Sequence, residues 1–116
     1  MSASPLTISM VSKALDGLSM RMAALADNLA NANSPRFQAV SVQFEDALRK
    51  AATNGPRAVE NLQIHFQAGH AYGPHDDRRV DLLVADAAQT AARYSALVEM
   101  LGQRMSIQRA AMGEQG

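Results

Sequence analysis

Two stretches of apolar residues, one near each end of the chain, recur in alternating steps of three and four. The first stretch comprises Ile8, Val11, Leu15, Leu18, Met22, Leu25 and Leu29. This heptad spacing places the side chains along one stripe of an α-helix, and it predicts a helix from about residue 6 to about residue 31. A stripe of this kind has to be covered by another part of the chain or by a partner.

The second stretch lies near the other end and comprises Val84, Ala87, Ala91, Tyr94, Val98, Leu101, Met105 and Met112, and it is broken only where Gln108 takes a position of the repeat. It predicts a helix over about 82–112, which Asp81 can cap and Gly113 can end. Two long helices with one stripe each can cover one another as an antiparallel, coiled-coil-like hairpin, so the expected fold class is mainly α. The alternative is that further copies or partners complete the core.

The residues between the two repeats have a different character. We expect a turn and extended segment over about 32–46 and a variable, irregular middle over about 47–79, which together with the helices form one domain over 1–116. Within these segments, residues 44–52 suit a short helix and residues 53–56 suit a turn. Leu62, Ile64 and Phe66 alternate with polar residues, as in a short β-strand.

Composition excludes several classes of function. Eleven basic and eleven acidic residues cancel, and no basic cluster exceeds a pair, so the chain lacks the charge that binds nucleic-acid phosphates. There is no cysteine and therefore no thiol chemistry. The common nucleophile, zinc-protease and phosphate-loop motifs are also missing from the sequence. We therefore expect that the protein is not an enzyme and that it binds no cofactor and no small-molecule substrate.

Three histidines raise the question of a metal site. His65, His70 and His75 recur every five residues and are followed by Asp76 and Asp77. Steps of five do not place ligands on one face of a helix, and the glycines and proline among them are typical of a loop. We therefore predict a solvated polar loop, and a metal-binding regulatory module is the less favoured alternative.

The first helix is expected to end at a distinctive motif made of Asn28, Asn31, Asn33, Ser34, Pro35 and Phe37. Asparagine side chains bond to nearby backbone, and a proline restricts the residue before it to extended geometry. This part of the sequence therefore stops the helix and redirects the chain. An ordinary helix stop explains the Asn and Pro residues, but it does not explain their order.

The order of residues in "NLANANSPRFQA", 28–39, resembles the signature that follows the first helix in axial proteins of the bacterial flagellum. The segments around Tyr94 and before Leu82 are similar to that family as well. Among its members the chain looks most like the flagellar basal-body rod proteins, and within these the proximal, B-type rod subunit, with a C-type sibling as the nearest alternative. The family usually has Gly where this chain has Arg36, so we expect a type I turn or an extended passage there.

The resemblance implies a structural subunit of the rod that assembles with itself and with other rod subunits into a helical tube and transmits torque for motility. The implied partners are other rod subunits, basal-body ring and adaptor proteins, and the flagellar type III export apparatus. The implied location is the periplasmic rod of the basal body, reached without a cleaved signal peptide. The alternative from another class is a small helical adaptor or secretion chaperone.

Overall fold

The first helix lies close to where its heptad repeat places it. The computed structural model describes residues 4–34, 37–69 and 79–113. Helix α1 spans Pro5–Ala30, with Ser4 accepting a hydrogen bond from the Thr7 N–H at 3.1 Å and Pro5 in the first turn. A capping hydroxyl followed by proline is a common start of a helix, because both deal with N–H groups that have no partner within the helix.

The last helix is longer than expected. Helix α4 spans Arg79–Ala111. It begins ahead of Asp81, so Asp81 does not cap the helix as expected but lies in its first turn, where a negative charge still favours the helix dipole. At the other end Gly113 has a positive φ of 71° and its N–H donates to the Ala110 carbonyl at 3.1 Å. This glycine ends the helix as predicted.

Four short elements lie between the two long helices, within residues 40–68, which we name the middle segment. They are β1 (Val40–Val42), α2 (Glu45–Ala52), α3 (Pro56–Asn61) and β2 (Phe66–Ala68). The strands pair antiparallel with Val40 opposite Ala68 and Val42 opposite Phe66. The predicted strand thus contributes only Phe66 to the ladder, while Leu62 and Ile64 precede it and pack on the core. Helix α3 was not anticipated from the sequence.

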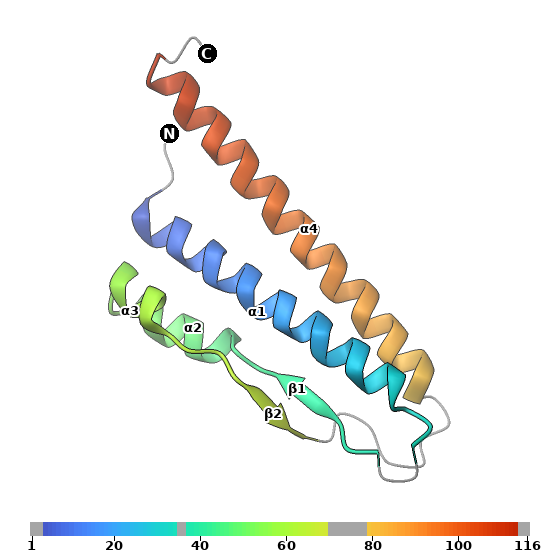
Figure 1. Cartoon of the computed structure of the whole chain (residues 1–116). Helices are drawn as coiled ribbons and strands as arrows, with labels where there is room; N and C mark the ends of the chain where they lie inside the picture. Colours follow the sequence, from blue (N-terminus) through green and yellow to red (C-terminus); the bar gives the residue numbers. More distant parts are fainter. Residues whose placement is uncertain (1–3, 35–36, 70–78, 114–116) are drawn as a thin grey trace.

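The described elements form an elongated molecule of 59 × 29 × 16 Å. In Figure 1, α1 lies between α4 on one side and α2, α3 and the two strands on the other. The fold class is therefore mainly α, with two long terminal helices and a small β element, as the sequence predicts. Helix α4 also runs past the N-terminal end of α1 (Figure 1).

The core consists of two clusters along α1. The larger one joins α1 to the middle elements through the buried residues Leu18, Ala24, Val42, Phe44, Leu48 and Val59. The smaller one joins the end of α1 to the start of α4 through Leu25, Ala32 and Leu83, with Ala87 packed against it. The core therefore contains buried side chains from the face of α1 away from its predicted stripe as well as from the stripe itself.

The seam between α1 and α4 differs from the predicted one. Leu83 is buried, and Tyr94 and Leu97 pack against the larger cluster. Val98 and Met105, which we expected to hold the hairpin, have exposed fractions of 47% and 50%. The stripe of α4 that faces α1 is displaced by about one residue from the predicted stripe. It contains Leu83 and Leu97 in place of the shorter Val84 and Val98. These exposed fractions correct the predicted assignment of Val98 and Met105 to the seam between α1 and α4.

Candidate assembly interface

Asn28 joins the end of α1 to the first strand. Its side chain is 3% exposed. Its Nδ2 donates to the Val40 carbonyl at 2.8 Å, and its Oδ1 accepts from the Val40 N–H at 2.8 Å. The amide therefore makes the two hydrogen bonds that a neighbouring strand residue would make. This fixes how the chain folds back along α1 after the motif.

Local hydrogen bonds link the other described residues of the motif. The Asn31 side chain donates to the Asp27 carbonyl at 2.8 Å, the Ser34 N–H donates to the Asn31 carbonyl at 3.0 Å, and the Phe37 N–H donates to the Ser34 carbonyl at 3.1 Å. Asn33 and Ser34 are exposed. Pro35 lies outside the described residues.

The same motif holds the start of α4. The guanidinium of Arg79 lies over the half-buried Phe37 ring, 4.6 Å from its centroid, and donates to the Ala32 carbonyl. Arg36, where we predicted a type I turn or an extended passage, also lies outside the described residues. The motif therefore connects three parts of the molecule, which are the end of α1, the start of β1 and the start of α4.

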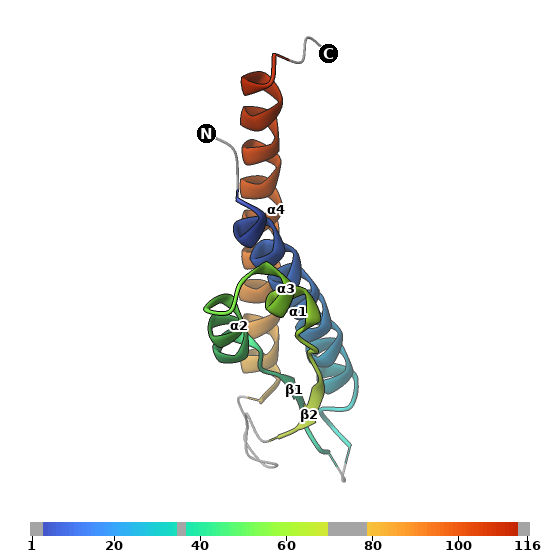
Figure 2. The same ribbon diagram turned by 90° about the vertical axis from the view of Figure 1, so that its left-hand side faces the viewer.

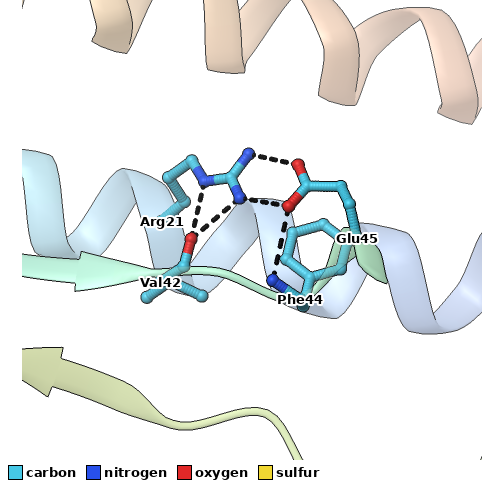
Figure 3. Close-up of polar contacts among 4 residues, drawn as sticks. All are labelled: Arg21, Val42, Phe44 and Glu45. Atoms are coloured by element: carbon cyan, nitrogen blue, oxygen red, sulfur yellow. Dashed lines mark hydrogen bonds and ion pairs between the residues drawn. The ribbon is translucent and has the colours of Figure 1, made fainter. Parts of the chain in front are cut away.

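A second polar cluster connects the end of β1 and the start of α2 to the centre of α1 (Figure 3). The Nε and one terminal nitrogen of Arg21 donate to the Val42 carbonyl at 3.0 and 2.8 Å. Its two terminal nitrogens donate to the Glu45 carboxylate at 2.7 Å each. The hydrogen bonds from Arg21 lower the pKa of Glu45 to about 2. The guanidinium also lies 5.0 Å from the centroid of the Phe44 ring.

Two further residues of α1 have roles that the sequence did not reveal. A Cβ on Gly17 would lie 2.6 Å from atoms of the Phe44 ring, so only glycine lets this ring reach the helix. Lys13 donates to the carbonyls of Glu60 and Leu62 at 3.0 and 2.9 Å. Both carbonyls lie at the C-terminal end of α3, where the helix dipole favours a positive charge. An unexplained glycine within a heptad repeat was the available signal for Gly17.

The residues predicted to form the assembly seam take three kinds of position. Leu18 and Leu25 are buried, whereas Ile8, Leu29, Ala91, Val98 and Met105 are exposed. The remaining members, Val11, Leu15, Met22, Tyr94 and Leu101, are half-buried. The buried members belong to the core of one chain. The exposed members are available to a second molecule.

The histidine-rich segment does not form a metal centre among the described residues. His65 is exposed, and no group of three His, Asp or Glu side chains in the part of the chain that the structure describes is placed to hold an ion. His70, His75, Asp76 and Asp77 lie outside the described residues. No described helix is long and apolar enough to cross a membrane.

Comparison with known proteins gives two partial matches, each to a protein described as flagellar basal body rod protein FlgB. The protein from Borreliella burgdorferi is 40% identical over 48 residues, which cover 41% of this chain and 36% of the relative. The protein from Borrelia hermsii is 35% identical over 59 residues, which cover 51% of this chain and 42% of the relative. No family model matches the chain, and no solved structure matches it.

The two relatives confirm the predicted resemblance to proximal rod proteins of the bacterial flagellum. The aligned part of the chain spans less than half the length of either relative.

Proposed function

We propose that this chain is a structural subunit of the proximal rod of the bacterial flagellum, and that its role is assembly rather than catalysis. The observation that carries the proposal is the sequence identity of 35–40% with two rod proteins. The geometry supports it, since the molecule is elongated and leaves apolar side chains of both long helices in solvent. Exposed apolar surface of this kind is typical of an interaction site.

In this proposal the chain contacts copies of itself and other rod subunits through α1 and α4. Head-to-tail contacts that repeat without closing produce a helical tube, which can transmit torque. The subunit reaches the rod through the flagellar type III export apparatus, and basal-body ring and adaptor proteins are its further partners. The exposed seam residues stabilise the tube because their burial is gained only on assembly.

The proposal is tested by locating the chain in cells. A tagged copy is expected in purified basal bodies, in the fraction that contains the rod, and deletion of its gene is expected to stop rod formation and motility. Complementation with the intact gene is the control. A tagged chain that stays in the soluble fraction while the deletion strain swims would contradict the proposal. A stable soluble dimer bound to an exported protein would favour the adaptor alternative.

A further inference from the structure

Half of each heptad repeat faces outward. In α1 the row of residues at every seventh position is Ile8, Leu15, Met22 and Leu29, and its two end members are 38% and 41% exposed. In α4 the corresponding row is Val84, Ala91, Val98 and Met105, all of them exposed. Residues seven apart lie along one line of a helix. Each long helix therefore carries one apolar line that the described chain leaves partly or wholly uncovered.

The two lines lie on the same side of the helix pair. On α1, Gly17 and Asn28 contact the middle segment, and they lie on the opposite side of the helix from the row that contains Leu15. On α4, Gln89 and Arg93 line a hollow of about 270 Å³ with β1, again opposite the exposed row. Figure 2 views the molecule from the side of the middle segment, with α2 and α3 in front of α1 and α4 behind it. The two rows, without Met105, thus form one surface, which we name the outer flank; it comprises Ile8, Leu15, Met22 and Leu29 of α1 and Val84, Ala91 and Val98 of α4.

The C-terminal part of α4 runs past the end of α1 and is exposed to solvent. We name residues 102–112 the overhang. Every side chain described there is exposed, including Met105, Ile107 and Met112. The overhang begins where α4 runs past the N-terminal end of α1 (Figure 1). It is therefore a helix end whose apolar side chains are left uncovered by the described part of the chain.

The outer flank and the overhang carry complementary charges. The overhang contains Arg104 and Arg109 and no acidic residue, whereas exposed Asp16 and Glu99 border the outer flank. Small exposed residues, Ser12, Ser19 and Ala26, lie beside the apolar row of α1 and allow a second helix to approach closely. Because the overhang continues the helix that forms part of the flank, the two surfaces cannot meet within one copy.

We propose that the overhang of one copy binds to the outer flank of a second copy. Met105 and Met112 then cover the apolar rows, and Arg104 and Arg109 lie toward the acidic border. The contact joins two different surfaces, so it leaves a free flank and a free overhang after each step and repeats in one direction. This inference rests on the proposed function and assigns the surface through which like subunits join.

Disulfide trapping tests the contact, since the chain has no cysteine of its own. One copy carries Ser106→Cys in the overhang, and the other carries Ser12→Cys, Ser19→Cys or Ala26→Cys along the flank. A mixture under mild oxidation is expected to yield the mixed disulfide with the flank position that lies in register. The matched control is Ala47→Cys, an exposed residue of α2 on the other side of the molecule. Trapping no better than this control at all three flank positions overturns the proposal.

Charge reversal provides a second readout on the purified chain. The double variant Arg104→Glu, Arg109→Glu is expected to weaken self-association about tenfold in sedimentation equilibrium, with the same helicity as the parent chain. Combining it with Asp16→Arg and Glu99→Arg is expected to restore the association. Unchanged association in the double variant overturns the proposal. If the overhang cysteine is trapped in cells only by a different rod protein, the second-copy contact is wrong while the proposed function stands.

Discussion

Gly17 shows how a single missing side chain positions the middle segment. A residue that looks like a weak point in a heptad repeat is the place where the Phe44 ring meets the helix backbone. Phe44 is buried and belongs to the larger core cluster. Glycine at this position lowers the intrinsic stability of the helix, but it allows a large aromatic side chain to pack closely against the backbone.

The pair of helical glycines gives a direct test at this scale. Gly17→Ala is expected to lower the free energy of unfolding by about 1–3 kcal/mol, because the added methyl group overlaps the Phe44 ring. The matched control is Gly102→Ala, whose Cβ would meet nothing within 4 Å and which is expected to add about 0.5–1 kcal/mol. Urea unfolding followed by circular dichroism measures both. Equal effects in the two variants would contradict the packing role of Gly17.

Asn28 supports the second prediction for a single residue. Asn28→Ala leaves the Val40 N–H and carbonyl without their side-chain partner, and it is expected to cost about 2–4 kcal/mol of unfolding free energy. Asn33→Ala, a change at an exposed residue of the same motif, is expected to cost less than about 0.5 kcal/mol. Thermal unfolding of the two variants side by side tests the assignment, which fails if Asn28→Ala is as mild as its control.

At the scale of elements, the contact between α1 and the start of α2 depends on pH. The pKa of Glu45 is about 2 in the folded chain against an ordinary 4.5. A lowered pKa means that the stabilisation is fully present above about pH 4.5 and is lost as the pH falls toward 2. Because the Glu45 side chain is 47% exposed, we expect the loss to be only about 1 kcal/mol.

Glu45→Gln is expected to remove this part of the pH dependence. The parent chain should lose more unfolding free energy between pH 5 and pH 2.5 than the variant does, by about 1 kcal/mol. Asp46→Asn is the matched control, since Asp46 pairs with Arg49 at a well-exposed site, where an ion pair contributes little to stability. Parallel profiles for the parent chain and Glu45→Gln would show that Arg21 does not hold the carboxylate in solution.

At the scale of the whole molecule, buried and exposed seam residues should behave differently. Leu25→Asp places a charge in the cluster with Ala32 and Leu83, so it is expected to unfold the pairing of α1 with α4 and abolish assembly and motility. Val98→Asp adds a charge on the outer flank, so it is expected to preserve helicity and thermal stability while motility is lost. Normal motility with Leu25→Asp, or a collapse of helicity with Val98→Asp, would contradict this division.

Much of the architecture was predictable from local signals. The spacing of Leu18 and Leu25 placed α1 to within a residue or two, and Gly113 marked the end of α4. The order of Asn, Ser and Pro residues identified the motif that turns the chain. What the motif contacts was not predictable, because the partners of Asn28 and Phe37 are the backbone of Val40 and the guanidinium of Arg79, both distant in sequence.

The sequence by itself determined that the chain has two long helices, where the first ends and which family signature follows it. These features depend on helical periodicity and on local backbone chemistry, which neighbouring residues encode. Only the tertiary structure decided which half of each heptad repeat is buried. The middle segment packs on one side of α1, and α4 turns so that Leu83 and Leu97 face inward. A row of apolar residues at heptad spacing looks the same in the sequence whether the core of its own chain or another molecule covers it. Neighbouring residues therefore do not determine what the row packs against.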